Sequence, residues 1–333
     1  MVDIVEHLKK RIRSEGPLSF RDYMEEVLRF YYSSARNRIG AAGDFYTAAD
    51  LDPIFGQLLA KQFEQWAAPF GRFTIVELGA GKGLLAHDIL RHRHFPYMIL
   101  ERSPAMRRRQ QELLKDHDVT WIDELPRGIT GCIFSNEFFD ALPVHRLVRR
   151  GDVLKEIYVT EDFHEIERDL QPPVPALYDR LGGDTPPLHE GQTVEVNLEA
   201  RHWIRRIAES LHRGYHVAID YGYLRDEFYA QPHGSLMCYW RHQAVENPYI
   251  RIGEQDITAH VNFSDLMEEP SLQTMLFTTQ KDYLIQLGIL DEMEKLATAG
   301  DSVSMQRLLR MKNLILPGSM GERFKVLVQS KQL

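Results

Sequence analysis

Three alternating glycines between two acidic residues form the part of this sequence best suited to hold a nucleotide-like ligand. Residues 75–85 read IVELGAGKGLL, in which Glu77 precedes the glycines Gly79, Gly81 and Gly83. Glycine lets the backbone approach a ligand closely, because it has no Cβ that would clash. Glu101 comes twenty residues after Gly81, and a carboxylate there could accept hydrogen bonds from both hydroxyls of a ribose. The spacing therefore predicts a site for a ligand that contains a nucleoside.

Lys82 within this turn suggests a phosphate-binding loop, and the glycine spacing suggests a dinucleotide site. A phosphate-binding loop requires serine or threonine directly after the lysine, whereas Gly83 follows Lys82. The dinucleotide motif requires glycine or alanine at the position where Leu84 stands. Neither motif fits the sequence, so Lys82 is expected to face solvent.

The pattern E-x-G-x-G-x-G resembles the first motif of class I methyltransferases that depend on S-adenosyl-L-methionine (SAM). This resemblance implies that the turn, with Glu77 before it, lies against the methionine part of SAM and that Glu101 binds the ribose. Asp123 and Glu124 follow the next strand and would lie near the adenine amino group. An NAD-dependent reductase is a distant alternative, since a carboxylate such as Glu101 serves the ribose of NAD equally well.

Strands that alternate with helices must position these residues. The periodicity predicts strands at 73–78, 97–102, 119–123 and 131–136, with helices at 84–93 and 104–117. Such alternation is typical of a parallel sheet covered by helices on both faces. Ligands bind beyond the carboxyl ends of such strands, which is where the glycines and Glu101 fall. Strands at 215–222 and 323–330 are expected to extend the same sheet.

The chain is expected to form one methyltransferase domain over residues 71–333, behind a helical cover over residues 1–70. The cover includes an amphipathic helix at the start of the chain and a second helix capped by Ser19. An insertion is expected at about 144–195, and additional substrate-side elements are expected at about 224–265.

Two features of the expected insertion can be read from the sequence. Residues 146–160 predict a hairpin that turns at Gly151 and Asp152. Residues 171–192 contain five prolines and three glycines, a composition typical of a surface excursion or lid rather than of a regular element.

Bulk composition limits the class of protein. The net charge of −8 argues against a general nucleic-acid binder. Cys132 and Cys238 are the only cysteines, which gives neither a metal cluster nor a disulfide framework, and the histidines lack ligand spacing, so no metal is expected. No apolar stretch could span a bilayer and residues 1–20 lack an apolar signal core. A cytoplasmic location without membrane insertion is therefore expected.

Segments along nearly the whole chain resemble one family, the MidA-type SAM-dependent methyltransferases, which include a mitochondrial complex I assembly factor that methylates arginine. The segments are GDFYTA at 43–48, VELGAGKGLLAHDILR at 76–91, LERSPAMRRRQ at 100–110, NEFFDALP at 136–143, AIDYGY at 218–223, DITAHVNF at 256–263 and FKVLVQ at 324–329. NEFFDALP and DITAHVNF are far more specific than any glycine pattern. The chain departs from the family at Ala80 and Lys82, where Pro or Arg is common, and at Asn262, where Asp is common.

This resemblance implies a fold, a cofactor and a kind of substrate. The implied fold is α/β, with the Rossmann-like seven-stranded sheet of class I SAM methyltransferases, whose last strand is antiparallel. SAM is the implied cofactor, S-adenosyl-L-homocysteine (SAH) its product, and a protein such as a complex I subunit the implied partner. GDFYTA is expected to close over the cofactor, with Asp44, Tyr46 and Thr47 as contacts.

An arginine acceptor requires carboxylates, because a guanidinium group is always charged and its lone pairs are delocalised. Glu137 and Asp140, at the end of the fourth strand, could clamp its N–H groups and hold one nitrogen toward the methyl group. His260 could accept the released proton. Asp140 could instead cap a helix that begins at Ala141, and His260 could be a structural histidine.

Further residues are expected to line the site. Asn136 could support the methionine end of SAM or the acceptor. Phe138 and Phe139 could wall the site and exclude water, although one of them is expected to belong to the core. Asp220 and Tyr221, at the end of a strand, would open onto the same cleft.

The leading hypothesis is a methyltransferase that acts on an arginine of a protein partner. The same fold could instead act on a small amine, hydroxyl or acid. A third hypothesis is a non-catalytic assembly factor that retains SAM binding for stability. The sequence leaves the oligomeric state open.

Overall fold

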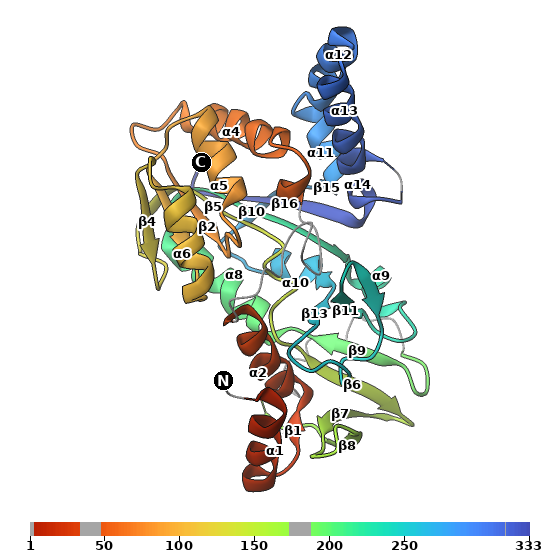
Figure 1. Ribbon diagram of the computed structural model, residues 1–333. Helices are drawn as coiled ribbons and strands as arrows, with labels where there is room; N and C mark the ends of the chain where they lie inside the picture. The colour runs from red at the N-terminus through yellow and green to blue at the C-terminus, as the bar shows by residue number, and fades with distance from the viewer. Residues whose placement is uncertain (1–2, 34–47, 173–187, 317) are drawn as a thin grey trace. The chain divides into compact units, whose positions relative to one another are not determined.

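The computed structural model describes residues 3–33, 48–172, 188–316 and 318–333 (Figure 1). The chain separates into two compact units, each built from three stretches. Unit 1 comprises Met1–Ser34, Phe139–Trp203 and Gly222–Glu268, and unit 2 comprises Ala35–Phe138, Ile204–Tyr221 and Glu269–Leu333. The domain scheme expected from the sequence, with a cover over residues 1–70, stays a prediction.

Unit 2 holds the large sheet. Its strands lie in the order β15-β16-β10-β5-β2-β3-β4, with bounds Gln273–Thr279, Phe324–Lys331, Leu211–Tyr223, Ile129–Asn136, Thr74–Leu78, Tyr97–Leu100 and Val119–Ile122. The pairings from β10 through β5, β2 and β3 to β4 are parallel, whereas β16 is antiparallel to both β10 and β15. The expected α/β fold with a large central sheet is confirmed. Among the described residues the sheet counts eight strands rather than seven, because β14 (Val261–Asn262) pairs with the end of β10.

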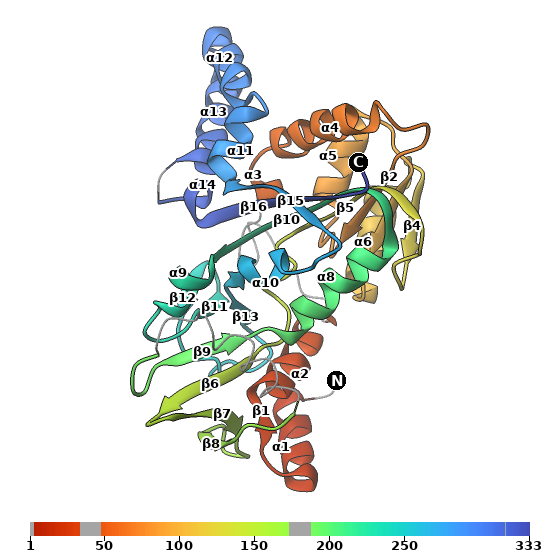
Figure 2. The same cartoon turned by 180° about the vertical axis from the view of Figure 1, so that it is seen from behind.

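Helices make up the rest of the regular structure of unit 2. They are α3 (Ala48–Leu51), α4 (Ile54–Ala67), α5 (Leu84–His92), α6 (Pro104–Leu113), α11 (Gln280–Gln286), α12 (Ile289–Ala299), α13 (Ser302–Ile315) and α14 (Met320–Arg323). Figure 2 shows α4 and α5 side by side over β2 and β5. All five residues of β2 are buried, as expected for a parallel strand covered on both faces.

Aromatic side chains attach α4 to the sheet. The ring of Phe63 lies 5.3 Å from that of Phe134 on β5. Trp66 stacks on Tyr215 of β10 with a centroid distance of 4.2 Å and an interplanar angle of 13°. Aromatic residues contribute the largest apolar areas to a core, so α4 is an integral part of the core around the parallel strands.

Unit 1 combines short helices, two of them from the start of the chain, with two small sheets. The helices are α1 (Ile4–Glu15), α2 (Phe20–Ser33), α9 (Arg225–Tyr229) and α10 (Phe263–Met267). One sheet contains β1 (Leu18–Ser19), β7 (Val153–Val159), β6 (His145–Arg150) and β9 (Thr193–Val196), with β8 (Glu165–Asp169) on β7; the other contains β12 (Gln243–Val245), β11 (Leu236–Trp240) and β13 (Asp256–Ala259). The helix α8 (Leu198–Ser210) and the strand β10 both pass from one unit into the other.

Local signals in unit 1 agree with these elements. Ser19 Oγ accepts a hydrogen bond of 3.1 Å from Asp22 N, as a helix cap should. Arg150 pairs with Val153, which confirms the predicted hairpin turn at Gly151 and Asp152. Most of the proline-rich residues 171–192 lie outside the described residues, so the expected surface excursion stays a prediction.

Candidate active site

The glycine turn lies between β2 and α5 and is confined by two side chains. Gly79, Gly81 and Gly83 have φ angles of +66°, +53° and +82°, which lie in the left-handed region that favours glycine. A Cβ on Gly79 would lie 2.9 Å from Cδ2 of Phe138, and a Cβ on Gly83 would lie 3.2 Å from Cγ of Gln110. The predicted turn therefore requires glycine for both its backbone conformation and its packing.

Glu101 follows β3 and presents a largely buried carboxylate. Its Oε1 accepts a hydrogen bond of 2.8 Å from Ser103 N, and its Oε2 accepts one of 3.1 Å from Gln110 Nε2. Burial raises the pKa of Glu101 above its ordinary value, while these two hydrogen bonds oppose the rise. The carboxylate is held at the strand end where the sequence places a ribose-binding acid.

Glu77 is buried inside the sheet, with 2% of its surface exposed. Its Oε2 accepts a hydrogen bond of 2.7 Å from the hydroxyl of Tyr97. Burial raises the pKa of Glu77 from 4.5 to about 7, and the charge of Glu101 adds to the rise. The contact of Glu77 with the cofactor stays a prediction.

Arg107 connects the ends of β3 and β4. Its Nη2 donates to the carbonyl oxygens of Glu101 (3.1 Å) and Ile122 (3.2 Å) and to Oδ1 of Asp123 (2.7 Å). Asp123 and Glu124 are otherwise exposed, so their adenine contact stays a prediction. Sequence reasoning missed Arg107, because its partners come together only after α6 packs beside both strands.

Lys82 is only partly exposed and is paired with an acid, which corrects the expectation of a simple solvent-facing side chain. Its Nζ contacts Oδ1 of Asp50, whose side chain is 6% exposed. Asp50 lies on α3, which packs against α5. The two residues are 32 positions apart, so the ion pair left no local signal in the sequence.

The turn after β5 carries Asn136, Glu137 and Phe138. Glu137 has a φ angle of +54°, a conformation that costs a residue other than glycine about 1–3 kcal/mol. Its backbone N–H donates to the carbonyl oxygen of Ile219 at 2.9 Å, and Asn136 Nδ2 donates to Oε1 of Glu137 at 2.9 Å. Strained backbone concentrates at functional sites, so this turn is the foremost catalytic candidate in unit 2.

Asp220 of β10 holds the same turn from the neighbouring strand. Its carboxylate is completely buried, and its Oδ2 accepts a hydrogen bond of 3.2 Å from Phe138 N while its Oδ1 accepts one of 3.0 Å from Tyr221 N. The ring of Tyr221 packs edge-on against Phe324 at 5.4 Å. Both residues were predicted to bind substrate, which stays a prediction, and the structure gives Asp220 a positioning role.

An unsatisfied acceptor lies beside these groups. Oδ1 of Asn136 is buried and has no hydrogen-bond partner among the described residues, and the same is true of the Ser135 hydroxyl. A buried polar atom without a partner costs roughly 1–3 kcal/mol. Hydrogen-bond donors such as the ammonium group of SAM would satisfy Asn136, and the ribose hydroxyls would satisfy Glu101. The glycine turn and these acceptors therefore fit SAM.

Asp140 lies in unit 1, in a turn rather than at the start of a helix. Residues 139–142 form no helix, so the alternative of a cap for a helix at Ala141 is wrong. Asp140 is 4% exposed, and its carbonyl oxygen accepts a hydrogen bond of 3.0 Å from Ala259 N of β13. That bond connects the segments NEFFDALP and DITAHVNF directly. Phe139, completely buried, is the core member of the two phenylalanines.

His260, also in unit 1, has a defined tautomer in its neutral form. Its Nδ1 lies 2.8 Å from the carbonyl oxygen of Ser235. A carbonyl can only accept a hydrogen bond, so Nδ1 carries the hydrogen and Nε2 is the basic nitrogen. Neutral His260 can therefore accept a proton only at Nε2, and its predicted role stays open to test.

Two residues that sequence reasoning missed position His260. The backbone N–H and the hydroxyl of Ser235 both donate to Oε2 of Glu195, at 2.5 Å and 2.9 Å. Glu195 is 3% exposed and lies 3.6 Å from Nε of Arg146. A Cβ on Gly234, whose φ is +74°, would lie 2.5 Å from Oε1 of Glu195. Two hydrogen bonds to one buried carboxylate oxygen restrict geometry, so Glu195 fixes the position of Ser235 and, through it, His260.

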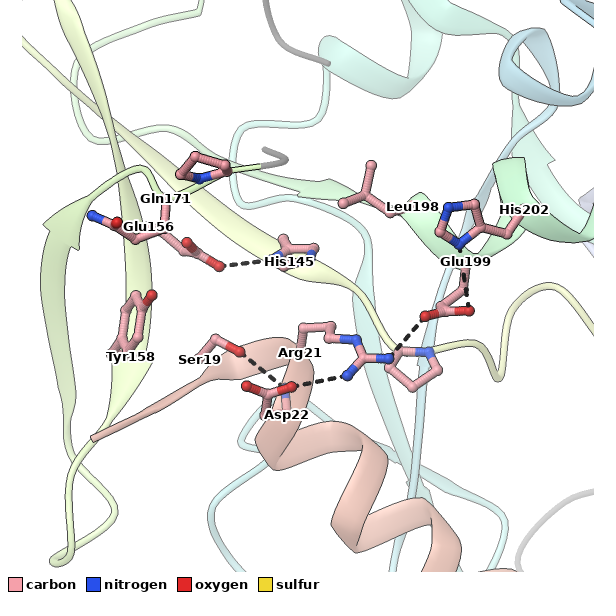
Figure 3. Close-up of a pocket in the computed structure, with 12 residues that line it drawn as sticks. Ser19, Arg21, Asp22, His145, Glu156, Tyr158, Gln171, Leu198, Glu199 and His202 are labelled. Carbon is pink, nitrogen blue, oxygen red and sulfur yellow. Dashed lines mark hydrogen bonds and ion pairs between the residues drawn. The ribbon is translucent and has the colours of Figure 1, made fainter. Parts of the chain in front are cut away.

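Unit 1 also contains a polar pocket that the sequence did not predict. It encloses about 330 Å³ between the start of α2, β6, β7 and the start of α8. Figure 3 shows Nδ1 of His145 facing Oε1 of Glu156 at 2.6 Å and the guanidinium of Arg21 between Asp22 and Glu199. These charges pair with one another, and the pocket contains none of the predicted site residues.

Asp44, Tyr46 and Thr47, the predicted contacts that would close over the cofactor, lie outside the described residues. Within the described part of the chain, no group of three or more metal-binding side chains lies close together. No helix there combines the length and the apolar character needed to cross a membrane.

The parallel sheet, the glycine turn and the buried acid at the next strand end define a SAM-binding α/β enzyme. The model of a family described as "Putative S-adenosyl-L-methionine-dependent methyltransferase" matches residues 54–276. The chain belongs to this family of SAM-dependent methyltransferases. The identification made from the sequence is thereby confirmed, together with SAM as the cofactor.

Solved structures and curated relatives agree with this assignment. A "likely methyl transferase from Burkholderia thailandensis bound to S-adenosyl-homocysteine" is 31% identical, with a TM-score of 0.91 over 98% of this chain and 92% of that chain. The relative in Danio rerio, "Protein arginine methyltransferase NDUFAF7, mitochondrial", is 28% identical over 97% of this chain and 85% of its own length. The homologue in Caenorhabditis elegans is 26% identical over 96% of this chain and 85% of its own length.

The expected cytoplasmic location is corrected by the same comparison. The relatives in Danio rerio, Drosophila melanogaster and Caenorhabditis elegans are all named as mitochondrial proteins. The expectation rested on the absence of an apolar signal core, which carries no information about a mitochondrial address.

Proposed function

We propose that this methyltransferase transfers the methyl group of SAM to an arginine side chain of a protein. The observation that carries the proposal is the strained turn at Glu137, whose carboxylate follows β5 and whose neighbour Phe138 packs on the glycine turn. The names of the curated relatives, which are protein arginine methyltransferases, support the choice of acceptor. A subunit of respiratory complex I is the partner that the resemblance favours.

The residues that would hold SAM are those of the glycine turn, Glu101 and Asn136. When bound, SAM supplies a methyl group on a positively charged sulfur. The glycine turn would lie against the methionine part of SAM, Glu101 would accept from ribose hydroxyls, and Asn136 Oδ1 would accept from a donor of the cofactor or the acceptor. Phe138 excludes water beside the turn. Holding the reactants in place supplies much of the acceleration in a displacement of this kind.

Glu137 and Asp140 have the chemistry that a guanidinium group requires. Each carboxylate can accept two N–H groups of the guanidinium, which draws its positive charge toward the nitrogens that are held. The remaining nitrogen then regains lone-pair density and can act as the nucleophile. His260 stays the predicted acceptor of the released proton.

Incubation with SAM labelled in its methyl group and a candidate complex I subunit tests the proposal. We expect labelled methylarginine after digestion of the subunit. Label in a small molecule of the mixture, but in no protein, would indicate a small-molecule acceptor. SAH binding without any transfer to the subunit or to a cell extract would indicate a non-catalytic assembly factor.

A further inference from the structure

We propose that Gln110 is a positioning residue that makes ribose recognition by Glu101 possible. Gln110 lies on α6 and has no exposed surface. Neither the glycine pattern nor the acids at the strand ends predict it. The inference rests on SAM as the cofactor of the family and on the proposed ribose contact of Glu101.

The side-chain amide of Gln110 joins three segments of the candidate cofactor site. Its Nε2 donates to the carbonyl oxygen of Gly81 at 2.8 Å and to Oε2 of Glu101 at 3.1 Å. Its Oε1 accepts a hydrogen bond of 2.9 Å from Nε1 of Trp121, on β4. The glycine turn, the acid after β3 and the strand before the predicted adenine contacts are thus held by one side chain.

Packing adds to these hydrogen bonds. A Cβ on Gly83 would lie 3.2 Å from Cγ and 3.5 Å from Cα of Gln110, so α6 can approach the turn only because residue 83 is glycine. The same side chain therefore bonds to one glycine of the turn and packs on the next. This double contact fixes the position of the glycine turn relative to Glu101.

Glutamine is suited to this position for three reasons. It offers two donors and an acceptor on one planar group, whereas lysine and arginine offer no acceptor to Trp121 and glutamate offers no donor to Glu101. It is neutral, so it adds no charge beside Glu101. It also holds one carboxylate oxygen while Ser103 N holds the other, which fixes the carboxylate plane and leaves further lone pairs for two ribose hydroxyls.

The test compares full-length variants in their binding of SAH and of an SAH analogue that lacks both ribose hydroxyls. Gln110→Met keeps the length of the side chain and removes all its hydrogen bonds; Gln110→Glu keeps the shape and the acceptor but removes both donors. Gln111→Met is the matched control, because Gln111 is the next residue on the same helix and is exposed. Calorimetry gives each Kd, and the melting temperature without ligand reports folding.

We expect both Gln110 variants to bind SAH roughly tenfold or more weakly than the wild type. Their Kd for the analogue without hydroxyls should rise by a clearly smaller factor, since only the support of the glycine turn at Gly81 is then lost. The control should match the wild type for both ligands. If Gln110→Met does not fold, Gln110→Glu decides the question alone.

Two results would overturn the inference. If the Gln110 variants bind SAH as tightly as the wild type does, Glu101 does not need Gln110 to bind the ribose. An equal loss for SAH and the analogue would show that Gln110 serves only the fold. Because the readout is binding, a wild type that binds SAH but methylates no arginine refutes the proposed acceptor and leaves this inference standing; a wild type that binds no SAH refutes both.

Discussion

The ring of Phe138 occupies the space that a side chain at Gly79 would need, since a Cβ there would lie 2.9 Å from its Cδ2. The turn that would hold the cofactor and the turn that carries Glu137 are therefore in direct contact. We therefore expect a change at Gly79 to alter the turn that carries Glu137 as well.

Gly79→Ala should destabilise the protein and weaken its binding of SAH. The φ angle of +66° is unfavourable for alanine and the new methyl group would strike Phe138, so we expect a loss of about 1–3 kcal/mol in the free energy of unfolding. Urea denaturation and calorimetry with SAH measure the two effects. Gly71→Ala is the control, because nothing lies within 4 Å of a Cβ there; equal behaviour of the two variants would contradict the account.

Asp220→Asn should lower methyl transfer more than it lowers SAH affinity. Asp220 accepts hydrogen bonds from the backbone of Phe138 and Tyr221, and an amide NH2 would face one of these donors. The loss of one such acceptor costs about 1–3 kcal/mol, which would release the turn at Glu137. Steady-state kinetics should show a kcat lower by about tenfold or more. Asp226→Asn, at an exposed position of α9, should have no effect, and a normal kcat in Asp220→Asn would refute the positioning role.

The buried carboxyl of Glu77 should make stability depend on pH in a defined direction. Its pKa is about 7 in the folded protein against an ordinary value of 4.5, so the folded state binds this proton more tightly than the unfolded state. Glu77 therefore lowers the free energy of unfolding progressively as the pH rises from about 4.5 to about 7. Glu77→Gln removes this pH-dependent contribution and keeps an oxygen that can accept the hydrogen bond from Tyr97.

The free energy of unfolding of Glu77→Gln, relative to that of the wild type, should rise by about 2–3 kcal/mol between pH 5 and pH 8. Urea denaturation at both pH values measures the difference. A difference between the two proteins that does not change with pH would show that Glu77 is already ionised in the folded state near pH 5.

His260→Gln should remove a proton acceptor without affecting the cofactor. A general base increases the rate by a factor of about 10²–10⁴. The kcat should therefore fall by a factor in that range, while the Kd for SAH stays within about twofold of the wild-type value. His212→Gln is the control, since His212 is exposed on β10. If His260→Gln retains full activity, the Nε2 atom has no part in the reaction and His260 is structural.

The sequence predicted those parts of the site that depend on local spacing. The glycine turn at Gly79, Gly81 and Gly83 can be predicted from a strand that is followed by a helix. The position of Glu101 can be predicted from the end of the next strand. The hairpin at Gly151 likewise depends on neighbouring residues. Such features can be recognised because the backbone conformation itself selects the residue type.

The residues that hold the site together could not be predicted in this way. Gln110, Ser235 and Glu195 acquire their partners only when distant segments pack, and each is an ordinary polar residue in the sequence. Lys82 was expected to face solvent for the same reason, because its partner Asp50 lies on another helix. The short strands β8 and β11–β13 also escaped notice, since their identity as strands depends on pairing rather than on a clear alternation.

Replacement of Glu137 tests the central claim, transfer of a methyl group to a protein arginine at this site, most directly. We predict that wild-type protein with labelled SAM produces labelled methylarginine in the protein substrate. Glu137→Gln should lose at least about tenfold in kcat with its SAH affinity unchanged within about twofold. The control Glu112→Gln, on the exposed side of α6, should retain full activity. No methylarginine from an SAH-binding wild type, or full transfer by Glu137→Gln, would contradict the account.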